Sequence, residues 1–195
     1  MALIVLVSVQ GFNSPTLINK MTFSPYNVKH HNQHGRFLSH LLIHADWGHL
    51  FFNMFSFYFF GSYMEMVLKI NYGLQAGSIH FLVLFFIGGL FATLWPYVRN
   101  QDNPNYQSLG ASGSVSAVIF AFVMWSPNES LYIMALFPIK AYIFGPLYLA
   151  IEYYAFRKGR SNIAHDAHIG GALFGIAYVL VINFDKGKEF FSQIF

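Results

Sequence analysis

The chain has 195 residues and a net charge of +3, and its composition is 55% hydrophobic but only 10% charged. A soluble globular domain carries about a quarter charged residues, so this composition excludes an ordinary soluble protein and favours an all-α membrane protein. The absence of cysteine excludes disulfides, thiolate metal sites and a cysteine nucleophile. The sequence has no basic stripe interleaved with aromatic residues, so it does not indicate a nucleic-acid partner.

The length suits one domain, residues 1–195. One membrane span needs roughly 20 apolar residues, so five or six spans would use most of the chain. Basic residues are concentrated beside apolar runs, where anionic lipid headgroups are the expected partner. These residues are Arg157, Lys158, Arg160, Lys186 and Lys188.

The elements expected in chain order are six transmembrane helices. The first apolar run, residues 1–12, is shorter than a full span and predicts a first helix that is either truncated or tightly trimmed at its start. A polar and aromatic connection, residues 13–46, is long enough that we expect it to be folded. The remaining spans are expected at residues 47–68, 75–98, 114–125, 131–156 and 163–184.

The fourth of these helices is the shortest, and it opens on the small-residue turn Gly110-Ala111-Ser112-Gly113. It ends at Pro127, because proline does not continue a helix. A helix of about 16 residues is too short for a hydrocarbon core of roughly 30 Å. Its start is therefore expected below the membrane surface, in a water-filled cavity with Ser112 at the bottom.

A base for Ser112 is expected on the sixth span. His168 shares a helix face with Gly171 and Gly175, and small residues let transmembrane helices approach closely. Gly113 begins a similar small-residue stripe on the fourth helix. If these two helices pack together, Ser112 Oγ reaches a ring nitrogen of His168, which is the arrangement that activates a serine nucleophile.

An oxyanion site is expected beside the same turn. Unpaired backbone N–H groups at a helix start favour developing negative charge, so the N–H of Ser112 is one candidate donor. His49 and Asn53 lie four residues apart on one face of the second span. Polar groups inside a membrane are functional candidates by default. The alternative is that this pair only forms hydrogen bonds to neighbouring helices.

Nine histidines raise the possibility of a metal site, notably at His30, His31 and His34. Exposed loop histidines are more often solvated, and no His-Glu-x-x-His helix is present. The intramembrane histidines also lack carboxylate neighbours at ligand spacing in the sequence. We therefore expect no metal and no cofactor, and a metal-dependent membrane enzyme or transporter ranks last among the readings.

Taken together, these motifs resemble the rhomboid intramembrane serine proteases of the bacterial six-helix type. The resemblance covers nearly the whole chain and rests on three motifs: His49 to Asn53, Gly110 to Gly113, and Ala167 to Gly175. It implies a polytopic six-helix bundle in which a short central helix carries the serine. It also implies tight helix packing at Gly110, Gly113, Gly171 and Gly175.

The resemblance implies a Ser112–His168 dyad with no carboxylate orienting the base, and an oxyanion hole formed by His49, Asn53 and Ser112. The fifth span and the loop after it would form the substrate gate, and Arg36, His40, His44 and Glu65 would be structural. Two departures stand out. Ser116 replaces the aromatic residue that many bacterial members place one turn after the serine, and Arg36 follows Gly35 rather than tryptophan.

The predicted function is an intramembrane serine endopeptidase that cleaves transmembrane or membrane-proximal segments of membrane proteins. Its partners would be those substrates and membrane lipids, in a bacterial inner membrane. The alternative is a catalytically inactive relative that binds transmembrane helices.

Overall fold

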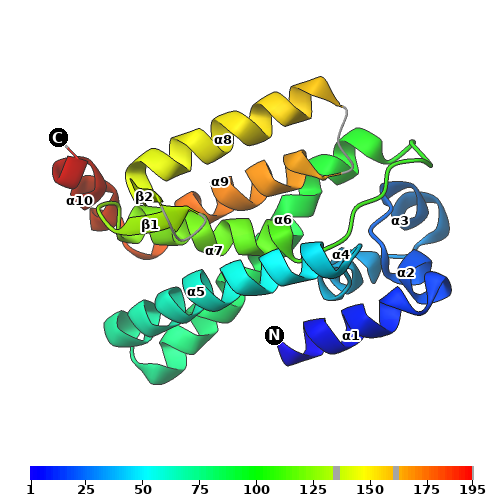
Figure 1. The fold of residues 1–195 in the computed structure, drawn as a ribbon, viewed down its shortest axis with the longest axis horizontal. Coiled ribbons are helices and arrows are strands. Elements are labelled where there is room, and N and C mark those ends of the chain that lie inside the picture. The colour runs from blue at the N-terminus through cyan, green and yellow to red at the C-terminus, as the bar shows by residue number, and fades with distance from the viewer. Residues whose placement is uncertain (134–136, 160–162, 195) are drawn as a thin grey trace.

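The computed structural model describes residues 1–133, 137–159 and 163–194, and the chain is mostly helical, as predicted (Figure 1). The helices are α1 (Ala2–Phe12), α2 (Pro15–Met21), α3 (Pro25–His31), α4 (Arg36–Ser39), the 3-10 helix η1 (His40–Leu42), α5 (Trp47–Tyr72), α6 (Leu74–Asn100), α7 (Ser112–Trp125), α8 (Ala141–Lys158), α9 (His165–Ile182) and α10 (Asp185–Ile194). Two strands, β1 (Ser130–Ile133) and β2 (Phe137–Lys140), form an antiparallel hairpin.

The core is built around α7. Every residue of this helix after Ser112 is buried, and α5, α6 and α9 pack directly against it. Figure 1 shows α8 lying along α9 on the outer side, with α2 to α4 at one end of the bundle and the hairpin with α10 at the other. A helix that is apolar all round requires such complete enclosure. The start of α7 is therefore held inside the protein.

Glycine shapes the two sharpest turns around this core. Gly73 alone joins α5 to α6, and its φ of 83° lies in the left-handed region that favours glycine. Gly110, with φ of 112°, turns the chain into α7.

The ends of α7 match the prediction closely, since this helix stops at Trp125, two residues before Pro127.

The connection between α1 and α5 is folded, as predicted. Ser14 and Ser24 cap α2 and α3 by accepting the backbone N–H of Leu17 and Asn27, both at 3.3 Å. The Arg36 guanidinium donates to the carbonyl of Asn19 at 2.7 Å and also to that of Thr22. Arg36 therefore fixes the connection internally, which gives it a structural role whatever residue precedes it.

The predicted fifth span, residues 131–156, is wrong at its start. Residues 130–133 and 137–140 pair as the β1–β2 hairpin, and residues 134–136 of the prediction lie outside the described ranges. Aromatic and β-branched residues such as Tyr132 and Ile139 favour strands, and Pro138 interrupts a helix. The span accordingly begins only at Ala141. The sixth helix ends at Ile182 rather than residue 184, and the separate helix α10 follows.

The helices differ in their suitability for crossing a membrane. In the described part of the chain, α6 and α9 are long and apolar enough to span one by length and composition, whereas α1 and α7 are apolar but shorter. Six spans are thus not confirmed by this measure. Large apolar side chains nevertheless cover the outward face of α5, including Phe51, Phe52, Phe55, Tyr58 and Phe59. Such a surface suits lipid rather than water.

Candidate active site

Ser112 and His168 lie in direct contact. Ser112 is the first residue of α7 and His168 lies in the first turn of α9, and the Nε2 of His168 is 2.7 Å from Ser112 Oγ. Ser112 is half-buried, whereas the rest of its helix is buried. A hydroxyl within hydrogen-bond reach of an imidazole is the arrangement of an activated nucleophile.

Glycines allow the two helices to come this close. A Cβ at Gly171 would collide with the backbone carbonyl of Gly113, and one at Gly175 would collide with that of Ala117. A Cβ at Gly113 would lie 2.7 Å from the Cβ of Ala92 on α6. The small residues singled out in the sequence therefore bring the backbones of α7 and α9 into contact. Close approach of this kind is what small residues permit in membrane helices.

Glu152 of α8 contacts the same histidine, although the resemblance implied a dyad with no carboxylate orienting the base. Glu152 Oε1 lies 3.1 Å from His168 Nδ1, an ion-pair distance although the ring is not aligned for a hydrogen bond. Glu152 Oε2 lies 2.5 Å from His165 Nδ1. By contrast, Asp166 accepts the hydroxyl of Tyr106 at 3.1 Å and is occupied there.

A signal for Glu152 was present in the sequence. It is the single acidic residue between Ala141 and Lys158, and an acid within an apolar span is a functional candidate by default. The contact was missed because Glu152 and His168 lie on different helices. Spacing within a sequence reports neighbours on one helix face, and says nothing about which helices pack together.

The same three side chains are close enough to hold a metal ion. Glu152, His165 and His168 each offer a ligand atom, and these atoms lie within 4.8 Å of one another. Two histidines and a glutamate are a donor set that zinc accepts. The sequence has no carboxylate at ligand spacing from these histidines, and the structure supplies one from another helix, α8.

The loop histidines have a different environment. His30 Nε2 lies 3.0 Å from Asp102, and Lys29 Nζ lies 2.8 Å from the same carboxylate. Hydrogen bonds from Lys29 and then His30 lower the pKa of Asp102. The His30, His31 and His34 cluster is not among the groups of three or more potential ligands in the described ranges. This surface ion pair joins α3 to the segment before α7.

The predicted oxyanion residues lie beside the turn that precedes Ser112. The ring of His49 packs against Gly110, where a Cβ would lie 2.7 Å from its Cε1. His49 Nδ1 accepts the backbone N–H of Ala45 at 3.4 Å, so the neutral ring carries its proton on Nε2. Among the described residues no partner accepts this Nε2–H, so His49 offers a donor next to the start of α7.

Asn53 is buried one turn further along α5. Its Nδ2 donates to the carbonyl of His49 at 3.0 Å, and its Oδ1 has no hydrogen-bond partner among the described residues. An amide nitrogen has two donors, so a second proton remains. Leaving a buried oxygen unpaired costs folding free energy. Stability of the fold alone therefore does not explain an asparagine at this position.

Ser116, which stands where an aromatic residue was expected, is hydrogen-bonded to Tyr148 of α8 at 2.9 Å. Tyr148 precedes Glu152 by four residues, so both point to the bundle from one face of α8. An aromatic side chain thus does lie next to α7, but a neighbouring helix supplies it. Its ring packs on Phe120 and Phe144.

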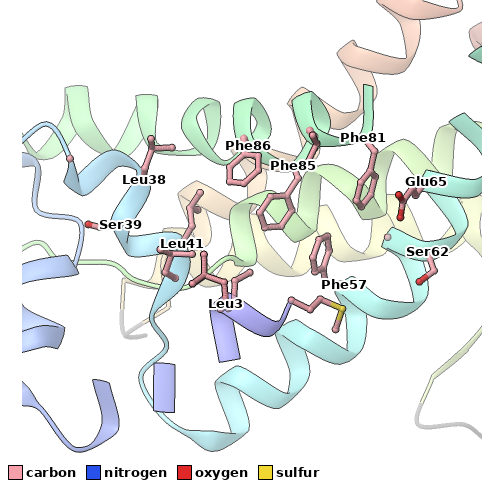
Figure 2. A pocket seen from close by; sticks show the side chains of 16 residues that line it. Leu3, Leu38, Ser39, Leu41, Phe57, Ser62, Glu65, Phe81, Phe85 and Phe86 are labelled. Carbon is pink, nitrogen blue, oxygen red and sulfur yellow. The ribbon is translucent and has the colours of Figure 1, made fainter. Parts of the chain in front are cut away.

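A separate cavity of about 720 Å³ lies between α1, α4, α5 and α6. Figure 2 shows Leu3, Leu41, Phe57 and Phe85 around it, with Glu65 at its edge. Glu65 accepts Lys69 Nζ at 2.6 Å. Neither Ser112 nor His168 lines this cavity, so it is distinct from the candidate active site.

The family model described as Rhomboid domain matches residues 31–183. RHOMBOID-like protein 12, mitochondrial, of Arabidopsis thaliana is 27% identical over 191 residues, covering 94% of this chain and 56% of that protein. Presenilin-associated rhomboid-like protein A, mitochondrial, of Danio rerio is 31% identical over 135 residues, covering 67% and 33%. The human presenilin-associated rhomboid-like protein, mitochondrial, is 29% identical over 140 residues, covering 70% and 35%.

The chain thus spans between about a third and somewhat over half of the length of these relatives. All three are named as mitochondrial, so the predicted bacterial inner membrane finds no support. The match to the family model extends from α3 to the end of α9 and includes every element of the site. The chain belongs to the rhomboid family of integral membrane proteins.

Proposed function

We propose that the chain is an intramembrane serine endopeptidase that cleaves transmembrane or membrane-proximal segments of membrane proteins. The observation that carries this proposal is the 2.7 Å contact between Ser112 Oγ and His168 Nε2 at the half-buried start of an otherwise buried helix. Membership of the rhomboid family supports it.

In this mechanism Ser112 Oγ attacks the carbonyl carbon of the scissile peptide bond while His168 Nε2 takes the hydroxyl proton. The carbonyl oxygen becomes an oxyanion. When it collapses, the C–N bond breaks, and the protonated His168 gives its proton to the leaving amine. A water molecule then attacks the acyl-enzyme by the same proton transfers, releases the new carboxylate and restores Ser112.

The oxyanion would be held at the start of α7. The Ser112 backbone N–H is one of the donors that a helix start leaves unpaired, and the helix dipole favours negative charge there. His49 Nε2–H and the second Nδ2 proton of Asn53 are the further donors. Two contacts support this role: His49 lies next to Gly110, and Asn53 is hydrogen-bonded to the His49 carbonyl.

The position of the site suits a peptide bond inside a bilayer. At 1.5 Å per residue, the 14 residues of α7 cover about 21 Å, less than the roughly 30 Å of hydrocarbon. We place the chain across the membrane as six helices within one domain. The substrate enters from the side of α8, of which only Ala141 and Gly145 are buried, and membrane lipids contact the outer faces.

The test is labelling of the full chain in detergent with a fluorophosphonate, which transfers its phosphonyl group to an activated serine and releases fluoride. We expect Ser112→Ala and His168→Ala to abolish labelling. Ser114→Ala is the matched control, because Ser114 is buried on the same helix, against Gly89, with no hydrogen-bond partner for Oγ among the described residues. It should label as the wild type does.

Labelling that persists in Ser112→Ala would overturn the proposal. A folded wild type that does not label would favour the inactive, helix-binding relative.

A further inference from the structure

Glu152 is held between two imidazole rings. Its two carboxylate oxygens face His168 Nδ1 at 3.1 Å and His165 Nδ1 at 2.5 Å, and the three side chains are between 11% and 13% exposed. Isolating an ionised carboxylate from water is costly unless it is paired. Here both oxygens are paired, and both partners lie on α9, one of them being the proposed base.

We propose that Glu152 is a positioning residue that orients His168 and stabilises its protonated form. This inference rests on the proposed function. For His168 Nε2 to accept the Ser112 proton, the neutral ring must carry its own proton on Nδ1. Glu152 Oε1 lies on that side of the ring, 3.1 Å from Nδ1, an ion-pair distance that lets the carboxylate attract this N–H without an aligned hydrogen bond. When His168 takes up the serine proton, the resulting imidazolium faces a carboxylate, as in a serine–histidine–acid triad.

His165 holds the carboxylate in that orientation. Its Nδ1 occupies Glu152 Oε2, which leaves Oε1 to face His168. The hydrogen bond at Oε2 restricts rotation of the carboxylate about its terminal bond. His165 is thus a second positioning residue, and it acts only through Glu152.

A purely structural role for Glu152 makes a different prediction. If Glu152 only ties α8 to α9, removing its charge would lower the unfolding temperature and leave the chemistry of Ser112 intact. If it orients the base, the chemical step slows while binding of the probe and stability change little. The two roles therefore separate in the kinetics of a saturable covalent probe.

The experiment measures the maximal rate of inactivation by a fluorophosphonate, kinact, and the concentration for half that rate, KI. In Glu152→Gln, kinact should fall about 10²- to 10⁴-fold, as when a triad acid is neutralised, with KI and the unfolding temperature unchanged. Glu152→Asp keeps the charge and should restore part of kinact. Glu65→Gln is the control, because it removes another paired glutamate, 2.6 Å from Lys69, away from the site.

A Glu152→Gln variant with wild-type kinact would overturn the inference while Ser112→Ala still showed that the protein is a serine hydrolase. If Glu152→Gln does not fold, His165→Asn is measured instead. A wild-type kinact in His165→Asn would also overturn the inference. A wild-type rate that collapses with a chelator and returns with Zn²⁺ would assign the cluster to a metal. If the wild type and Ser112→Ala were labelled at the same rate, both this inference and the proposed function would be overturned.

Discussion

Within the described ranges, hydrogen bonds of nearly the same length join two serine–histidine pairs. Ser8 Oγ lies 2.9 Å from His44 Nδ1, and Ser112 Oγ lies 2.7 Å from His168 Nε2. The first pair joins α1 to the segment before α5, and the second joins α7 to α9. Only the second is a candidate for catalysis, and the difference lies in the surroundings of each pair rather than in its distance.

The Ser8–His44 pair has no proton to give. The Ser8 hydroxyl donates to the carbonyl of Leu42 at 3.0 Å, so it accepts from His44 Nδ1. His44 Nε2 accepts the backbone N–H of Ala111 at 3.4 Å. Both side chains are fully buried, and burial lowers the pKa of His44 to about 3. This pair is a neutral link that supports the turn before Ser112.

In the Ser112–His168 pair the hydrogen bond runs in the opposite direction, from the serine hydroxyl to the histidine ring. The partner of the Ser112 hydroxyl in the described structure is the histidine itself, and the far ring nitrogen faces Glu152. Ser112 is also half-buried rather than enclosed. The direction of the proton, the access to the hydroxyl and a counter-charge therefore distinguish the candidate nucleophile Ser112 from the structural Ser8.

Among changes outside Ser112, His168 and Glu152, the largest effect should come from Asn53, the oxyanion donor proposed for the second pair. We expect Asn53→Ala to slow fluorophosphonate labelling about 10²- to 10³-fold, the usual cost of losing one such donor. Asn71→Ala is a close control, because Asn71 lies on the same helix and donates to the Val67 carbonyl at 2.8 Å, also four residues back. Equal labelling rates for the two variants would remove Asn53 from the site.

Gly171→Ala should have a smaller effect on the labelling rate and should also lower the stability of the fold. The added Cβ meets the Gly113 carbonyl, so α9 must move and His168 moves with it. A misplacement of about 1 Å can cost about 10²-fold in rate, and overpacking typically costs about 1–3 kcal/mol of stability. Labelling and thermal unfolding would both be measured.

The matched control is Gly35→Ala, where a Cβ would have no heavy atom within 4 Å. Full labelling by Gly171→Ala would show that the second pair does not depend on contact between the helix backbones. The Ser8–His44 pair lies on other elements and should persist in both variants.

The smallest effect concerns His44 and pH. Its pKa of about 3 in the fold lies below the 6.5 of an ordinary histidine, so the unfolded chain takes up the proton first as pH falls. The contribution of His44 to stability is therefore complete above about pH 6.5 and is lost progressively toward pH 3. We expect the unfolding temperature in detergent to fall between pH 7 and pH 4, and to fall less steeply in His44→Gln.

His31→Gln replaces an exposed histidine and should keep the wild-type slope. His40, whose pKa burial lowers to about 4, accounts for dependence that remains in His44→Gln. Identical slopes in wild type and His44→Gln would contradict a neutral His44.

Much of the helical fold could be predicted because apolar length and helix punctuation are local properties. Pro127 and the turn at Gly110 indicated the ends of α7 to within two residues. The hairpin at residues 130–140 was missed because a short apolar run reads equally as strand or helix. Helix α10 was missed because its amphipathic sequence was read only as a basic segment.

The site could be predicted only where its motifs lie within one element. His49 and Asn53, or His168 with its glycines, are spaced along single helices. Glu152 and Tyr148 reach the site from α8, and which residues of different helices meet depends on packing that no spacing encodes. The rule that buried charges in a membrane need an explanation would have identified Glu152, had it been applied to every helix.

The way α8 is attached has one more consequence. Few residues of this helix are buried. Its described polar contacts include the hydrogen bond from Tyr148 to Ser116 and the ion pairs from Glu152 to the two histidines. Swinging α8 outward into lipid would carry an unneutralised carboxylate into hydrocarbon and leave the histidines without their anion. Such an opening is electrostatically self-limiting. Under the proposed function it would also separate His168 from its anion, so that hydrolysis would start only after α8 returns.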